Sequence, residues 1–96
     1  MNLIIRPRET GKARQLLEAA AQTDAIVAAE NPGALQTKAK AYKIYGLEII
    51  SYDDLIEGNY HTHQRAYIHN GDKFMKYLMA KKYGLELCGF SATVED

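Results

Sequence analysis

Short apolar runs alternate with segments of helical periodicity along the chain, and this alternation is the strongest constraint on its fold. Five runs have the length and apolar character of buried strands: 3–5, 25–29, 47–51, 66–69 and 85–90. Apolar residues recur at the spacing of one helix face in the segments 12–22, 32–45, 53–57 and 72–83. Because strands joined by helical crossovers run parallel, we predict an α/β fold with a five-stranded, mainly parallel sheet and helices on both faces.

Several of the predicted helix ends carry residues that favour capping. Asn31 is a natural N-cap, and Pro32 suits the first position of the helix that follows it. Gly46 and Gly84 are placed to end two helices in the left-handed conformation. These residues set the expected boundaries of the second and fourth helices.

The composition is that of one small domain, 1–96, with 47% hydrophobic and 25% charged residues. Lys and Arg number 12, as do Asp and Glu, so no strong net field attracts nucleic acid or an anionic membrane. No apolar run approaches the roughly 20 residues that span a bilayer, and the single Cys88 cannot form an internal disulfide. We therefore expect a cytoplasmic protein whose small core is stabilised further by a protein partner or by a second copy of the chain.

Most of the unusual polar residues directly follow the predicted strands. Ligands of open parallel sheets bind beyond the carboxyl ends of the strands, so the candidate turns are 6–12, 30–31, 51–53, 69–72 and 89–93. The first turn contains Arg-Glu-Thr-Gly-Lys-Ala at 8–13, which matches part of the phosphate-loop pattern G-x-x-x-x-G-K-[ST]. Gly11 and Lys12 keep the second glycine and the lysine. Arg6 and Ala13 replace the first glycine and the hydroxyl.

Taken in chain order, the five turns resemble the motif series of the first RecA-like domain of DEAD-box-type helicases and related P-loop NTPases. The similar stretches are 8–13, Ala29-Glu30-Asn31-Pro32, 51–55, 67–72 and the Ser-Ala-Thr within 89–93. The resemblance implies a reduced P-loop NTPase-like (RecA-like) core. It also implies that ATP or another phosphate ligand would lie against Thr10, Gly11 and Lys12, with Arg8 nearby.

The departures from that motif series point away from catalysis. His69 and Asn70 stand where the Walker B motif has its acidic pair, and Ala13 removes the hydroxyl that holds Mg²⁺. Phosphoryl transfer depends on positioning and charge neutralisation, so we expect hydrolysis to be lost, with no catalytic residues and no resident cofactor. The leading hypothesis is a non-hydrolysing binding or regulatory module that acts through protein contacts and keeps a residual phosphate or nucleotide site. A phage or mobile-element accessory role would suit its small size.

Two alternatives stay open at this point. A weak nucleotide-dependent NTPase would need Mg²⁺ to be held by waters and by Asp53 or Asp72. As a simpler interpretation, Asp53 and Asp54 cap their short helix and complement its dipole. A nucleic-acid-binding protein would use Arg6 and Arg8, although the balanced net charge counts against it.

The remaining chemistry-bearing residues favour structural roles. His61, His63 and His69 could hold a metal through imidazole nitrogens, but no cysteine or carboxylate has a helpful spacing, so we favour ordinary loop histidines and predict no metal. Cys88 lies in an apolar run and is expected to be buried in a strand. The lysines of 72–83 are expected to face solvent.

Overall fold

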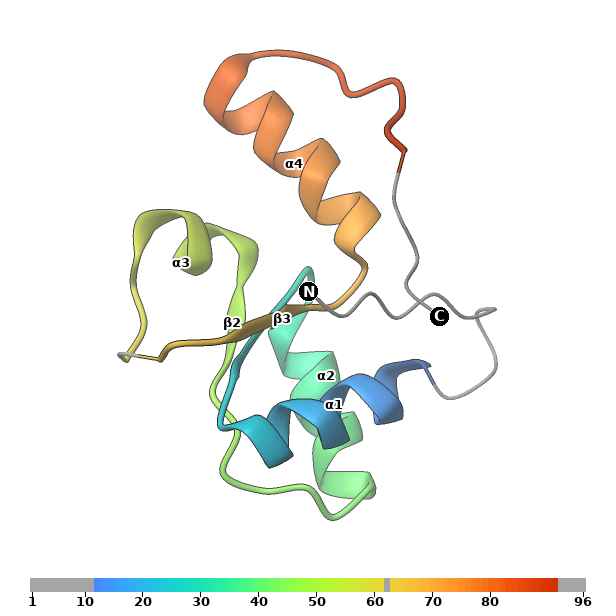
Figure 1. Ribbon diagram of the computed structural model, residues 1–96, viewed down its shortest axis with the longest axis vertical. Helices are drawn as coiled ribbons and strands as arrows, with labels where there is room; N and C mark the ends of the chain where they lie inside the picture. Colours follow the sequence, from blue (N-terminus) through green and yellow to red (C-terminus); the bar gives the residue numbers. More distant parts are fainter. Residues whose placement is uncertain (1–11, 62, 92–96) are drawn as a thin grey trace.

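The structure of the protein is a computed structural model that describes residues 12–61 and 63–91. The elements in chain order are α1 (Lys12–Thr23), β1 (Ile26–Ala29), α2 (Pro32–Ala41), β2 (Ile49–Ser51), α3 (Tyr52–Glu57), β3 (Ala66–Ile68) and α4 (Gly71–Tyr83). The strands form one parallel sheet in the order β2-β1-β3 (Figure 1). The predicted α/β class and parallel sheet are confirmed, but the described sheet has three strands, so five was wrong.

The central strand β1 is apolar because it is covered on every side. In register, Val27 of β1 lies opposite Ile49 of β2 and Tyr67 of β3. All four residues of β1 are buried, as expected for a central parallel strand that has helices on both faces. This strand is the structural centre around which the other elements are arranged.

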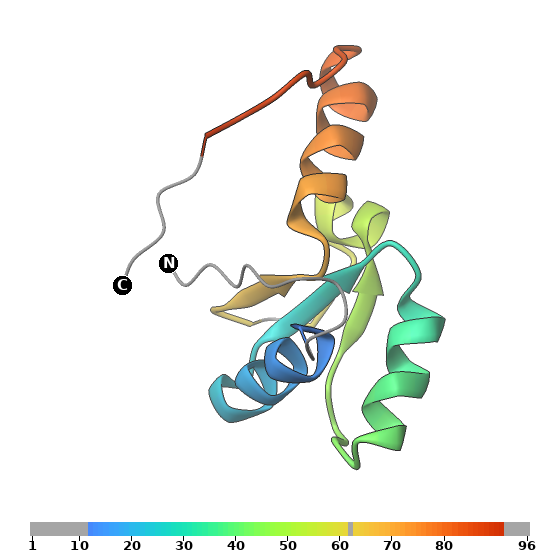
Figure 2. The same ribbon diagram turned by 90° about the vertical axis from the view of Figure 1, so that its right-hand side faces the viewer.

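Alternate residues of β1 point into two separate hydrophobic clusters. Val27 and Ala29 pack with α1 and α2, where Leu17 is fully buried. Ile26 and Ala28 pack with α3 and α4, where Phe74 is the buried residue of α4. The helices therefore cover the sheet in pairs, α1 with α2 on one face and α3 with α4 on the other (Figures 1 and 2). The connection from β1 to β2 contains α2 and the connection from β2 back to β3 contains α3, so connections of one hand that run in opposite directions place the two helices on opposite faces.

The second helix ends earlier than predicted, at Ala41 rather than residue 45. Lys43 takes the left-handed conformation, with φ of 60°, and its amide donates to Lys40 O at 3.0 Å. The amide of Ile44 then donates to Ala39 O at 2.9 Å, which completes a Schellman motif. The early stop lets Ile44 fold back onto the cluster formed by α1 and α2.

The strand predicted at 85–90 was also wrong. Gly84 ends α4 in the left-handed conformation as expected, with φ of 64°. Beyond the far end of α4 the chain turns back without strand pairing (Figures 1 and 2). Leu85 and Phe90 are 54% and 57% exposed, because the apolar run pairs with none of the described strands. The predicted strand 3–5 lies outside the described residues and stays a prediction.

A candidate ligand site at the carboxyl edge of the sheet

The order of the strands places a topological switch point at the centre of the sheet. The chain passes from β1 to β2 on one side of β1 and returns to β3 on the other. Open α/β sheets bind ligands outside the carboxyl ends of strands at such a point. The residues that follow the three strands there are Glu30 after β1, Tyr52 after β2 and His69 after β3.

Tyr52 connects the ends of β2 and β3. Its ring is buried and packs edge-on against Phe74, with the ring centroids 5.1 Å apart. Its hydroxyl donates to the main-chain oxygens of His69, at 2.5 Å, and Asn70, at 3.1 Å. Burial, with smaller contributions from Glu30 and Asp72, raises the pKa of Tyr52 to about 12, so the hydroxyl keeps its proton at neutral pH.

Beside Tyr52 lies an open pocket of about 600 Å³. Its walls come from the ends of β1 and β2, the first turn of α3, and one face of α4. The lining residues are Glu30, Ser51, Tyr52, Asp53, Lys73, Lys76 and Tyr77. The volume falls within the range of small-molecule sites, roughly 300 to 1,000 Å³.

Local structure explains why these side chains face the pocket. Ser51 is the N-cap of α3, and its Oγ accepts the amide of Asp54 at 3.1 Å. The spacing of Lys73, Lys76 and Tyr77 along α4 places the three on one helix face. Ser51 therefore caps the helix, and the prediction that Asp53 and Asp54 are its caps was wrong. The two aspartates lie in the first turn of the helix.

The carboxylate of Asp53 accepts hydrogen bonds from side chains of α4, so it is not free to bind a metal ion. Its Oδ1 accepts the hydroxyl of Tyr77 at 2.6 Å and also a hydrogen bond from Lys81. The Lys81 ammonium, and next the Tyr77 hydroxyl, lower the pKa of Asp53. Lys81 is exposed, as expected for the lysines of 72–83, and its ammonium also lies 3.8 Å from Glu57.

The two lysines that line the pocket differ in how they are paired. Lys73 Nζ lies 3.8 Å from Glu30 Oε2, in a long and solvent-exposed ion pair. Lys76 is exposed and makes no ion pair within residues 12–61 and 63–91. Lys76 is therefore the cation of this pocket with the least competition from protein carboxylates.

Lys12 of the phosphate-loop prediction lies at the same edge of the sheet. It is the first residue of α1, and its Nζ donates to Asn70 Oδ1 at 3.2 Å. Burial, followed by the charges of Lys12, Lys38 and Lys73, lowers the pKa of His69, so this imidazole is neutral at pH 7. Lys12 and His69 are thus brought together. Arg8, Thr10 and Gly11 lie outside the described residues.

The three histidines do not converge. His61 and His63 precede β3 and His69 follows it, so they lie at opposite edges of the sheet. In the ranges 12–61 and 63–91, no group of three or more His, Cys, Asp or Glu side chains is placed to hold a metal ion. Cys88 is exposed, so its predicted burial was wrong.

Comparisons of this chain with protein-family models, with curated proteins and with solved structures gave no match. The resemblance of its strand ends to P-loop NTPase motifs therefore stays a prediction. None of the described helices combines the length and the apolar character needed to cross a membrane.

Sequence reasoning located the edge of the sheet but missed the pocket. Ser51 and Asp53 were among the candidate turn residues, whereas Lys73 and Lys76 were expected only to face solvent. The available signal was their spacing of three and four residues on a helix that follows the last strand. Which strand end this face would meet depended on the strand order, which local patterns do not specify.

Proposed function

We propose that this protein is a non-hydrolysing binding module that holds a small phosphate-bearing ligand at the carboxyl edge of its sheet. The observation that carries the proposal is the pocket of about 600 Å³ at the ends of β1 and β2, with Lys73 and Lys76 on its wall. The pocket lies where parallel α/β sheets bind their ligands. Its lysines supply the positive charge that a phosphate requires.

The remaining pocket groups favour a ligand that carries hydroxyls as well as phosphate. Glu30 is a carboxylate acceptor for hydroxyl protons. The Ser51 oxygen uses a lone pair to accept the amide of Asp54, so its hydroxyl hydrogen remains available to a ligand. Tyr77 supplies an aromatic wall. A nucleotide or a sugar phosphate has this combination of groups.

Binding without turnover is the expected behaviour of this site. The weak-NTPase alternative needs Asp53 or Asp72 to take part in holding Mg²⁺. Asp53 is already occupied by Lys81 and Tyr77, which argues against its use as a metal ligand. Asp72 lies in the first turn of α4, where a carboxylate is favourable without any metal.

Calorimetry tests the proposal with ADP, ATP, ribose 5-phosphate and inorganic phosphate as separate ligands. Lys76→Ala is expected to weaken binding by about 10- to 100-fold, since it removes a charge-assisted hydrogen bond of about 1.5–3 kcal/mol. Lys82→Ala is the matched control, because Lys82 belongs to the last turn of α4 and does not line the pocket. No heat with any of the four ligands would refute the proposal.

Lys12→Ala distinguishes the pocket from a surviving phosphate loop. If the phosphate binds in the pocket, the loss of Lys12 has little effect, because its amine is held by Asn70. If Lys12→Ala abolishes binding and Lys76→Ala does not, the phosphate lies at the start of α1. Phosphate release that depends on Lys12 would instead establish the NTPase alternative.

A second candidate function, contact with a protein partner, is favoured by the surface at the end of α4. Tyr83, Leu85 and Phe90 are 62%, 54% and 57% exposed, and all lie beyond the part of α4 that packs on the sheet. Light scattering of the wild-type chain and of Leu85→Ser tests whether this surface joins two copies. If both proteins are monomers, this surface does not join two copies, and its partner would have to be a different protein.

The nucleic-acid alternative rests on residues beyond the described ranges. Arg6 and Arg8 are its predicted contacts, whereas the described Arg14 pairs with Glu18 at 2.8 Å. A salt-dependent mobility shift that weakens when Arg6 and Arg8 are changed would support it.

A further inference from the structure

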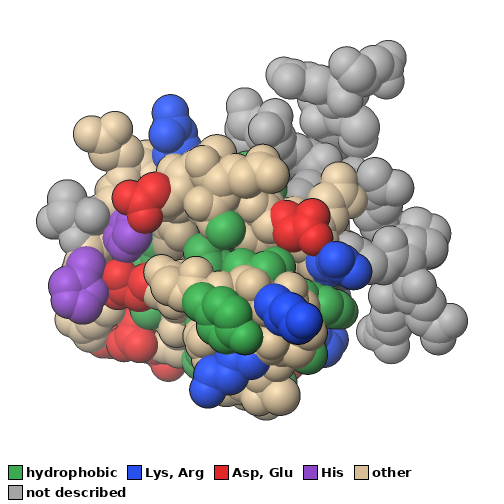
Figure 3. All heavy atoms as spheres, turned by 90° about the horizontal axis from the view of Figure 1, so that it is seen from below, with side chains coloured by type: hydrophobic (Ala, Val, Ile, Leu, Met, Phe, Trp, Pro, Cys, Tyr) green, Lys and Arg blue, Asp and Glu red, His purple; other side chains and the backbone are tan. Residues whose placement is uncertain are grey.

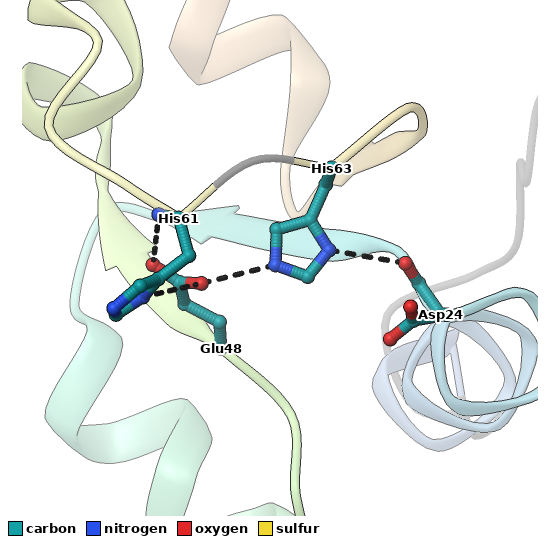
Figure 4. Close-up of polar contacts among 4 residues, drawn as sticks. All are labelled: Asp24, Glu48, His61 and His63. Atoms are coloured by element: carbon teal, nitrogen blue, oxygen red, sulfur yellow. Dashed lines mark hydrogen bonds and ion pairs between the residues drawn. The ribbon is translucent and has the colours of Figure 1, made fainter.

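At the amino edge of the sheet, the His63 ring lies between two acceptors from different parts of the chain (Figure 4). Its Nδ1 lies 3.1 Å from the main-chain oxygen of Asp24, in the turn between α1 and β1. Its Nε2 lies 3.0 Å from Oε1 of Glu48, just before β2. The His63 side chain is only 15% exposed, so water has limited access to replace either partner.

Neither partner of His63 has a hydrogen to donate. A main-chain carbonyl oxygen is only an acceptor, and an ionised carboxylate is only an acceptor. A neutral imidazole carries one N–H and can satisfy one of these two oxygens, whereas imidazolium carries two. The observed arrangement is therefore complete only when both ring nitrogens are protonated.

We infer that His63 is an imidazolium in the folded protein and acts as a pH-dependent clamp on the amino edge of the sheet. The clamp joins the segments that lead into β1, β2 and β3, because Asp24, Glu48 and His63 belong to one segment each. When His63 loses a proton, one of its two acceptors loses its donor. The segment leading into β3 is then less firmly held.

Glu48 is the anionic half of the clamp. Its Oε2 accepts the main-chain amide of His61 at 3.1 Å, and its Oε1 faces His61 Nδ1 at 3.2 Å as well as His63. The amide of His61, followed by the side chains of His63 and His61, lowers the pKa of Glu48 against a smaller opposing effect of burial. Glu48 is therefore ionised at neutral pH and cannot supply a proton to His63.

The charged groups that face the His63 ring favour its protonated form. Asp24 faces it from the turn after α1 and Glu48 from the start of β2, and both are acidic. His61, on the same segment as His63, is exposed and shares Glu48 with it. Seen from below, the surface carries histidine side chains next to acidic side chains on its left side (Figure 3). The carbonyl of Asp24, and next the Glu48 carboxylate, raise the pKa of His63.

NMR of the wild-type chain tests the inference without any substitution. Long-range proton–nitrogen spectra report the protonation of each ring nitrogen, and a free histidine peptide serves as the reference. We expect both nitrogens of His63 to remain protonated at a pH above the reference value of 6.5, where the free imidazole is mostly neutral. His63 found as a neutral tautomer at that pH, or titrating together with the free peptide, would overturn the inference.

Glu48→Gln provides the second arm of the test, with His61→Gln as the control. Removing the carboxylate charge should move the titration midpoint of His63 downward, whereas His61→Gln leaves the Glu48 partner in place and should change it little. An unchanged midpoint in Glu48→Gln would show that Glu48 is not the partner. If Glu48→Gln does not fold, the wild-type spectra alone still decide the protonation state.

Discussion

The hydroxyl of Tyr52 donates to the main-chain oxygen of His69 at 2.5 Å, although 17 positions separate the two residues. Because Tyr52 follows β2 and His69 follows β3, this bond ties the two outer strands together across the end of β1. The same ring lines the ligand pocket and packs on Phe74 of α4. The strand ends and the pocket wall are thus held by one side chain.

Tyr52→Phe should therefore destabilise the fold. The change leaves the ring in place but removes the donor to the oxygens of His69 and Asn70, which costs about 1–3 kcal/mol where the acceptors are poorly solvated. Urea denaturation measures the effect. Tyr60→Phe is the control, because Tyr60 is 40% exposed. Equal stability of the two variants would contradict the role given to Tyr52.

Leu17→Ala should have the largest effect on stability among simple truncations in α1. Leu17 is fully buried in the cluster between α1, α2 and the sheet, so its loss creates a cavity that costs about 2–5 kcal/mol. Leu85→Ala is the matched change at an exposed leucine and should alter the free energy of unfolding by less than about 0.5 kcal/mol. Thermal or urea unfolding of both variants checks the position of the core.

Lys43→Gly should stabilise the protein. Lys43 holds φ of 60°, where a residue with a Cβ is strained and glycine is not, so we expect a gain of about 0.5–1 kcal/mol. Lys40→Gly is the opposite control, because Lys40 belongs to α2 and its replacement should destabilise by up to about 1 kcal/mol. A loss of stability in Lys43→Gly would show that α2 does not end in the Schellman motif described above.

The clamp at His63 predicts the pH dependence of stability. A group whose pKa is raised by folding stabilises fully below its unfolded value and loses that effect as pH rises through the folded value. The lowered pKa of Glu48 acts in the opposite sense, and its contribution is lost in acid. The stability difference between the wild type and His63→Gln should thus be largest between the reference values of 4.5 and 6.5 and shrink above them. A difference that grows as pH rises above 6.5 would contradict the clamp.

The parts of the fold that could be predicted from sequence are those that local chemistry determines. Asn31 caps α2 through its side chain, which accepts the amide of Ala34 at 3.1 Å, and Pro32 opens the helix as expected. The apolar run 25–29 predicted a buried strand, and the alternation of elements predicted the parallel sheet. The proximity of Lys12 to the end of β3 followed from the same reasoning, since helix starts and strand ends share one edge of a parallel sheet.

The parts that were missed depend on contacts distant in sequence. The run 85–90 has the apolar content of a strand, but it pairs with none of the three described strands. The early end of α2 at Ala41 depends on Ile44 reaching the core, which a search for the next glycine does not detect. The pocket needs α4 to lie over the end of β2, and the clamp needs Asp24 to meet His63. Both relationships exist only after the strand order is set.

The measurement that tests the central claim most directly is an amide NMR titration of the wild type and Lys76→Ala with ADP, with phosphate release followed in parallel. We predict shifts confined to Glu30, 51–53 and 73–77, a binding constant weakened about 10- to 100-fold in Lys76→Ala, and no release of phosphate from ATP. Unchanged spectra with ADP and with ribose 5-phosphate, or shifts confined to 83–90, would contradict a ligand site at the carboxyl edge of the sheet.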